Sequence, residues 1–199
     1  MLLQRVITAV VLLIIIIGAL LISPLVFTAV AAIAIGCCFW EWLRICKWNN
    51  GVAMVCGVVL GASLFFLEYA SPAALQTVQS GNGLMIITAT ATVLWAVITA
   101  VIFTRRTSGW RVPQGIGALL GWIFVPAAWF SLMYLFREKG TIYMLSVLAI
   151  VWVADIMAYF GGRCFGGPKM AQGISPKKTW SGALTAFVCV LALSYVLYW

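Results

Sequence analysis

The sequence predicts an all-α protein that crosses a membrane about seven times, with its N-terminus in the cytoplasm. Of its 199 residues, 65% are hydrophobic and only 8% are charged, and the mean hydropathy is +1.14. A soluble domain of this length cannot bury so much apolar surface, because folding leaves a large area in contact with water. A span needs about 20 apolar residues, so the chain has room for roughly seven spans and little else. We therefore expect a single transmembrane domain over residues 1–199.

Seven apolar runs follow one another along the chain, and turn-forming residues separate them. The first run is too long for the apolar part of a signal peptide and no small-residue cleavage site follows, so we expect a retained span. Ser23-Pro24 ends it, while Asn49-Asn50-Gly51 and Ser80-Gly81-Asn82-Gly83 are typical of turns. A polar link from Arg105 to Pro113 precedes the fifth run. The predicted spans are residues 6–22, 25–43, 52–67, 84–103, 115–135, 142–160 and 183–198, and residues 161–182 form a loop, here called the motif loop.

The distribution of positive charge predicts the orientation of the chain. When the loops are assigned alternately to two sides, ten cations fall on one side, and Arg137 and Lys139, beside Glu138, fall on the other. Cytoplasmic loops carry an excess of lysine and arginine. We therefore expect the N-terminus and the motif loop on the cytoplasmic face of a bacterial-type inner membrane. The ten cations are Arg5, Arg44, Lys47, Arg105, Arg106, Arg111, Arg163, Lys169, Lys177 and Lys178.

The residue types present exclude several classes of site. The chain has no histidine, which excludes zinc sites built from histidine. Its six cysteines form no C-x-x-C pair, and most lie in apolar runs, where cysteine packs as a small hydrophobic residue. The motif loop is not a Walker A loop, because Pro168 and Met170 occupy the lysine and hydroxyl positions. The net charge of +8 lies in short loops, as membrane topology requires, so we expect no nucleic-acid partner.

Asp155 is the first candidate for a catalytic residue. It is a lone carboxylate inside an apolar run, where a charge costs roughly 2.5–3.5 kcal/mol on insertion scales, and such residues usually line a functional site. The alternative is a structural acid that pairs with Arg163. Tyr159 lies one turn later on the same helix face and would either bind a headgroup or anchor the helix at the interface. Glu41, near another span end, is expected to pair with Arg44.

The segment Ser175–Thr179 predicts a helix start that binds an anion. Serine is a favoured N-cap and proline a favoured first helical residue, so we expect the last span to begin at Pro176. Lys177 and Lys178 would then lie in the first turn, where the helix dipole disfavours cations unless an anion binds. The alternative is that both lysines only follow the positive-inside bias. Four glycines of the motif loop are expected to let the backbone approach a ligand: Gly161, Gly162, Gly166 and Gly167.

The residues in and before the motif loop follow a recurrent pattern. The chain carries W-x-x-D-x-x-A-Y-x-x-G-R-x-F-G and then K-x-x-x-x-x-S-P-x-K-T-W-x-G. This pattern resembles the CDP-diacylglycerol synthases, or phosphatidate cytidylyltransferases, and Arg5 and the W-E-W at 40–42 resemble the N-terminal half of that family. The resemblance covers essentially the whole chain. The matching residues are Trp152, Asp155, Ala158, Tyr159, Gly162, Arg163, Phe165, Gly166, Lys169, Ser175, Pro176, Lys178, Thr179, Trp180 and Gly182.

The resemblance implies a membrane enzyme that joins CTP to phosphatidic acid and releases pyrophosphate, with Mg²⁺ as its cofactor. Asp155 and Lys178 are the implied catalytic residues, and Asp155 would also contribute to the metal site. The protein is expected in contact with membrane lipid, and a homodimer is compatible with the resemblance. The implied substrate-binding residues are Tyr159, Arg163, Lys169, Ser175, Lys177 and Thr179, of which Lys177 falls at a position that the family leaves variable.

The chain also departs from the family. Met157, Gly167-Pro168 and Gln172 replace residues that are common there, and the aspartate-rich C-terminal signature is absent. No carboxylate follows Asp155, whereas a metal-dependent nucleotidyl transfer needs oxygen ligands. We therefore expect a C-terminally truncated chain whose activity and remaining metal ligands depend on the absent segment. Two alternative functions stay open: a CTP-dependent kinase of polyprenol or another lipid alcohol, and a membrane transporter of an anionic solute.

Overall fold

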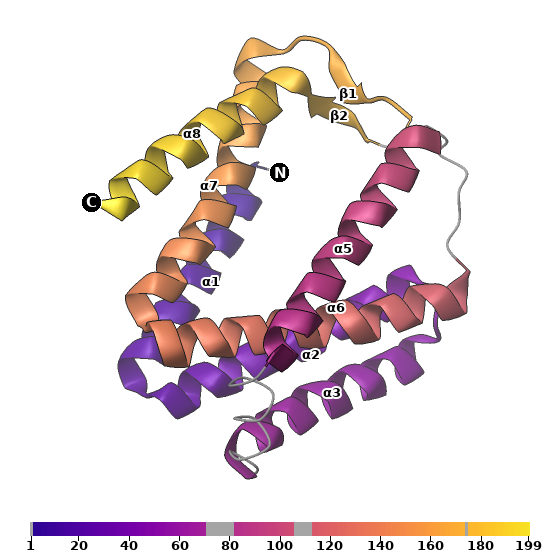
Figure 1. Ribbon diagram of the computed structural model, residues 1–199, viewed down its shortest axis with the longest axis vertical. Helices are drawn as coiled ribbons and strands as arrows, with labels where there is room; N and C mark the ends of the chain where they lie inside the picture. Colours follow the sequence, from indigo (N-terminus) through magenta and orange to yellow (C-terminus); the bar gives the residue numbers. More distant parts are fainter. Residues whose placement is uncertain (1, 71–81, 106–112, 174) are drawn as a thin grey trace. The chain divides into compact units, whose positions relative to one another are not determined.

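A computed structural model describes residues 2–70, 82–105, 113–173 and 175–199. Six of the described helices are long and apolar enough to cross a membrane, and the apolar part of another, Ile7–Ile22, is shorter. The predicted all-α, polytopic membrane fold is confirmed. In chain order (Figure 1) the elements are α1 (Leu2–Ile22), α2 (Pro24–Ile45), α3 (Asn50–Ala70), α5 (Asn82–Arg105), α6 (Gln114–Tyr134), the π-helix η1 (Leu135–Lys139), α7 (Thr141–Phe165), the strands β1 (Lys169–Ala171) and β2 (Ser175–Thr179), and α8 (Trp180–Tyr198).

The first two turn signals of the sequence lie where helices begin. The Ser23 hydroxyl accepts a hydrogen bond from the Val26 N–H at 3.2 Å, and Pro24 is the first residue of α2. The Asn49 side chain accepts from the Gly51 N–H at 2.9 Å, at the start of α3. These are the donors that a helix start leaves without an internal partner. Of the predicted turn Ser80–Gly83, Asn82 and Gly83 are the first residues of α5. Its first two residues and the cations Arg106 and Arg111 lie outside the described residues.

The contacts within the chain group its residues into two compact units. Unit 1 contains α1, α2, α3, α5 as far as Ala91, and α6. Unit 2 contains the rest of α5, η1, α7, the two strands and α8. The sequence predicts one transmembrane domain, because its composition is uniform along the chain. The division into two units depends on contacts between helices, which composition does not reveal.

Glycines bring α2 and α3 together in unit 1. A Cβ atom on Gly57 would lie 2.5 Å from the carbonyl oxygen of Gly36, and one on Gly61 would lie 2.7 Å from that of Ala32. The two backbones are therefore in direct contact, as is common where small residues line a membrane helix pair.

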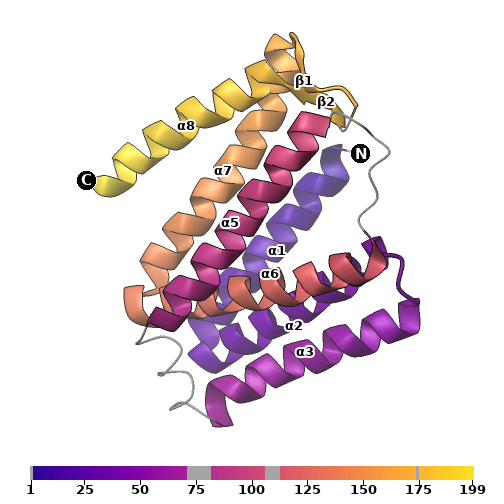
Figure 2. The same ribbon diagram turned by 45° about the vertical axis from the view of Figure 1, so that its right-hand side comes forward.

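Helix α6 packs against α2 (Figure 2). Aromatic residues form this contact. The Trp42 indole N–H donates to the carbonyl oxygen of Gly117 at 2.8 Å. Phe39, which is fully buried, meets Trp122 edge to face with ring centroids 4.8 Å apart. The expected ion pair between Glu41 and Arg44 does not occur in the described part of the chain. The Arg44 guanidinium instead lies over the Trp40 ring, 5.6 Å from its centroid.

Candidate functional site

Helix α7 continues five residues beyond the predicted end of its span. We expected the helix to end at residue 160 and the motif loop to begin at Gly161, but α7 ends at Phe165. Gly161 and Gly162 lie against the start of α8. A Cβ atom on Gly162 would lie 2.8 Å from Oγ1 of Thr179, the N-cap of α8, and one on Gly161 would overlap the Thr185 side chain. Their small size serves helix packing, and that packing holds this segment helical.

Three predicted site residues, Asp155, Tyr159 and Arg163, occur at intervals of four along α7, and we call them the polar stripe. Residues four apart lie on one face of a helix, and at 1.5 Å per residue the stripe is about 12 Å long. All three side chains are exposed. The Arg163 guanidinium donates a hydrogen bond from Nη1 to the Tyr159 hydroxyl at 3.1 Å. The structure therefore brings these predicted residues together.

Asp155 lies farther from the C-terminal end of its helix than the sequence suggested. It precedes the end of the helix by ten residues, or about 15 Å. We expected a buried acid, but its side chain is exposed, and it has no hydrogen bond or salt bridge to a described residue. The alternative ion pair with Arg163 is absent from the described residues, since Arg163 bonds Tyr159. Lipid cannot solvate a carboxylate, so Asp155 requires water or a polar ligand beside it.

A hairpin replaces the predicted helix start after α7. Ser175–Thr179 forms strand β2, which pairs antiparallel with β1, with Lys169 opposite Thr179 and Ala171 opposite Ser175. The prediction that the last helix begins at Pro176 is therefore wrong. Cross-strand hydrogen bonds decide the conformation here, and a two-stranded edge tolerates the proline. Gly166 and Gly167, with φ of 60° and 99°, allow the turn from α7 into β1.

Helix α8 begins at Trp180, and Thr179 caps it. The Thr179 hydroxyl accepts from the Gly182 N–H at 3.3 Å, and its oxygen lies 3.1 Å from the Ser181 hydroxyl oxygen. The Trp180 N–H donates to the carbonyl oxygen of Pro168 at 3.1 Å. Two N–H groups at the observed start of α8, those of Trp180 and Gly182, are thus engaged within the chain. The site for an anion consequently rests on cationic side chains more than on the helix end.

The hairpin presents three exposed lysines: Lys169, Lys177 and Lys178. The strand register is irregular between Lys169 and Ala171, opposite Lys177 and Lys178, so the usual alternation of side chains does not assign these two lysines to opposite faces. All three lysines are exposed cations of one short hairpin. With Arg163 in the last turn of α7, this segment holds four cations, and no carboxylate follows Asp155 in the sequence.

Two contacts that the sequence did not predict hold the start of α8 against α7. The Ser181 hydroxyl donates to the carbonyl oxygen of Gly166, which ties the start of α8 to the end of α7. A Cβ atom on Gly182 would lie 2.5 Å from the carbonyl oxygen of Ala158. The spacing of Ala158 and Gly162, two small residues four apart, is a recognisable sign of such a helix contact.

Replacing Thr179 with valine should destabilise the start of α8. Loss of an N-cap hydroxyl typically costs about 0.5–2 kcal/mol, while Thr179→Ser should keep most of the stability. Thermal unfolding of the purified protein measures this, with an expected fall of a few degrees for the valine variant. The predicted role of Thr179 as a substrate ligand is tested by the same pair of variants. If valine raises the KM for CTP without lowering the unfolding temperature, Thr179 acts as a ligand and the cap is unimportant.

Comparison with known proteins identifies the family. The model of the cytidylyltransferase family matches residues 3–199. The chain belongs to the cytidylyltransferase family. A phosphatidate cytidylyltransferase of Pseudomonas aeruginosa is 33% identical to it over 194 residues, which cover 92% of this chain and 65% of the relative. A phosphatidate cytidylyltransferase of Haemophilus influenzae is 27% identical over 209 residues, which cover 98% of this chain and 72% of the relative.

Shorter stretches of this cytidylyltransferase-family chain are more similar to other relatives. A phosphatidate cytidylyltransferase of Brucella melitensis is 60% identical over 38 residues, which cover 19% of this chain and 14% of the relative. No solved structure matches the chain. The chain spans about two thirds of the length of the Pseudomonas relative.

Proposed function

We propose that this protein transfers the cytidylyl group of CTP to phosphatidic acid, giving CDP-diacylglycerol and pyrophosphate. The observation that carries the proposal is the polar stripe, an exposed acid, phenol and guanidinium on one helix face, which leads directly into a hairpin with three lysines. Membership of the cytidylyltransferase family and relatives called phosphatidate cytidylyltransferase support the assignment. The protein is an integral membrane protein, so a lipid substrate is at hand.

The proposed reaction is one displacement at phosphorus. A phosphate oxygen of phosphatidic acid attacks the α-phosphorus of CTP, and the bond from that phosphorus to the oxygen bridging to the β-phosphate breaks. Pyrophosphate leaves with the electron pair of that bond. Catalysis of such a transfer depends on positioning and on cations that stabilise the developing charge. Arg163 and Lys178 are proposed to contact the phosphates, with Tyr159 orienting Arg163 through their hydrogen bond.

The remaining predicted ligands are proposed for the same substrates. Lys169 on β1 and Lys177 on β2 are both exposed and would bind the triphosphate. Ser175, partly exposed at the start of β2, would supply a hydroxyl. We also propose that the hairpin faces the cytoplasm of a bacterial inner membrane, which the bias of positive charge supports. CTP would reach it from there.

Magnesium stays part of the proposal on the strength of the resemblance. In the part of the chain that the structure describes, no three ligating side chains of the types His, Cys, Asp or Glu gather at one place. Asp155 is the one described carboxylate in the stripe, and Mg²⁺ usually takes one or two carboxylates together with substrate phosphates. The described residues alone do not form a protein-held magnesium site.

The products distinguish this reaction from its alternatives. Membranes that contain the protein are incubated with labelled CTP and phosphatidic acid, and the products are separated. We expect CDP-diacylglycerol and pyrophosphate in equal amounts. Release of CDP with phosphorylation of a lipid alcohol would show a kinase instead. Uptake of a labelled anion into vesicles, without turnover of CTP, would show a transporter.

Substitution of the two adjacent lysines tests how the hairpin binds phosphate. Since Lys178 matches a fixed position of the family pattern and Lys177 does not, Lys178→Ala should lower kcat/KM at least about tenfold, and Lys177→Ala should lower it less. Lys178→Arg, which keeps the charge, should retain most of the activity. The measurement is the rate of CDP-diacylglycerol formation. Equal losses in both alanine variants would show that the lysines act only as diffuse positive charge.

A further inference from the structure

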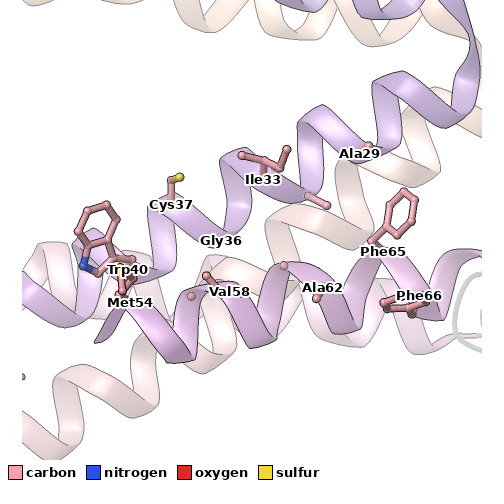
Figure 3. Close-up of a pocket in the computed structure, with 13 residues that line it drawn as sticks. Ala29, Ile33, Gly36, Cys37, Trp40, Met54, Val58, Ala62, Phe65 and Phe66 are labelled. Carbon is pink, nitrogen blue, oxygen red and sulfur yellow. The ribbon is translucent and has the colours of Figure 1, made fainter. Parts of the chain in front are cut away.

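A groove with an apolar lining runs along the α2–α3 pair of unit 1 (Figure 3). Its cavity volume is about 370 Å³, and all the residues that line it belong to these two helices. Trp40 and Met54 lie at one end of the groove, Ala29 and Phe65 lie at the other, and Val58 lies between them (Figure 3).

Glycines create this groove. Gly36, Gly57 and Gly61 line it, and at each of them a Cβ atom would overlap the backbone or side chain of the opposite helix. The two helices approach closely at these glycines, and the larger lining side chains lie beside the contact and form the walls of the groove. An unfilled hollow loses the dispersion contacts of its lining, so a groove open to lipid gains stability when hydrocarbon fills it.

The dimensions of the groove fit one hydrocarbon chain. Ala29 and Trp40 are eleven residues apart on α2, or about 16 Å, and one leaflet of the hydrocarbon core is about 15 Å deep. The length of the groove therefore matches that of one acyl chain in its leaflet.

The Trp40 end of the groove is polar and carries net positive charge. The Trp40 indole N–H donates to the Asn50 side chain at 3.1 Å, and the Arg44 guanidinium lies over the Trp40 ring. Lys47, exposed in the turn after α2, adds a second cation, and Glu41 is the one carboxylate of this segment. Tryptophan and basic residues are typical of membrane interfaces with anionic lipid. The far end, at Phe65, is apolar.

We propose that this groove binds one acyl chain of an anionic phospholipid of the surrounding bilayer, with its headgroup phosphate beside Arg44 and Lys47. The apolar body and the cationic end of the groove match the two parts of such a lipid. This binding site goes beyond the proposed reaction and does not depend on it.

Photo-crosslinking tests the site. The purified protein is reconstituted with phosphatidylglycerol or phosphatidylcholine that carries a diazirine on an acyl chain, and crosslinked peptides are mapped by mass spectrometry. We expect crosslinks concentrated on Ile33 and Val58, with about fivefold more from phosphatidylglycerol. Ala62→Phe fills the groove and should remove most of them. Ala34→Phe adds the same ring to an exposed position of α2 outside the lining and should leave them unchanged.

A second pair of variants tests the charged end without altering the lining. Arg44→Gln should reduce the preference for phosphatidylglycerol over phosphatidylcholine to nearly one, and Arg44→Lys should keep most of it. Crosslinks spread evenly over lipid-exposed residues, such as Val188 on α8, would overturn the proposal. Equal yields from the two lipids with the unaltered protein would also overturn it, as would a dimer in native mass spectra that Ala62→Phe abolishes.

Discussion

Asp155→Asn should lower kcat/KM for CDP-diacylglycerol formation at least about a hundredfold, the size of effect seen when one preorganised charged or polar group is removed from an active site. Asparagine keeps the shape of the side chain and removes its charge. The described structure gives Asp155 no partner within the chain, so its charge has no structural contact to lose. The measurement is the rate at which labelled CTP and phosphatidic acid form CDP-diacylglycerol in membranes that contain the variant.

Glu138→Gln is the matched control for this experiment. Glu138 is the other carboxylate of unit 2, it is exposed in η1, and the charge bias predicts it on the opposite side of the membrane. Its replacement should leave the rate within about twofold, as expected for a surface position. A normal rate in Asp155→Asn, at an equal amount of protein in the membrane, would remove Asp155 from the site.

Gly182→Val should separate α8 from α7 and inactivate the protein. The new Cβ atom would lie 2.5 Å from the carbonyl oxygen of Ala158 and 3.2 Å from the backbone of Gly162, and a helix backbone cannot turn aside as a side chain can. Overpacking of this kind costs about 1–3 kcal/mol. Trp180 and Ser181 bond the start of α8 to Pro168 and Gly166, which lead into β1, and β2 continues directly into α8, so the lysines of the hairpin would move with the helix.

The measurements for this variant are its unfolding temperature and its rate of CDP-diacylglycerol formation, and we expect both to fall. Gly18→Val is the control, because a Cβ atom on Gly18 in α1 meets nothing within 4 Å. The control should retain its unfolding temperature and its activity. If Gly182→Val behaves like Gly18→Val, the close contact of α7 and α8 is not what positions the hairpin.

The helices could be predicted from the sequence because their signal is local. Six of the described helices are each long and apolar enough to span a membrane. Ser23-Pro24 and Asn49 mark helix starts through bonds to residues two or three positions away. The polar stripe is also a local property, since Asp155, Tyr159 and Arg163 follow helical spacing.

The course of the chain after Phe160 could not be predicted, because contacts between distant residues decide it. Gly161 and Gly162 are typical of a loop, yet α8 packs against them and keeps α7 helical. Ser175-Pro176 is a good helix start by local rules, yet pairing with Lys169–Ala171 makes it a strand and moves the cap to Thr179. Because the helix starts after the lysines, we expect phosphate to bind to a set of cationic side chains and not to a helix end.

Labelling of Cys164 tests most directly whether the polar stripe and the hairpin bind CTP at the cytoplasmic face. Cys164 is exposed in the last turn of α7, next to Arg163. Sealed vesicles of both orientations are treated with a membrane-impermeant maleimide, with and without saturating CTP at constant ionic strength, and the Cys164 peptide is quantified by mass spectrometry. We expect labelling from the cytoplasmic side alone, slowed severalfold by CTP. Labelling from the opposite side, or a rate that CTP leaves unchanged, would contradict the proposed site.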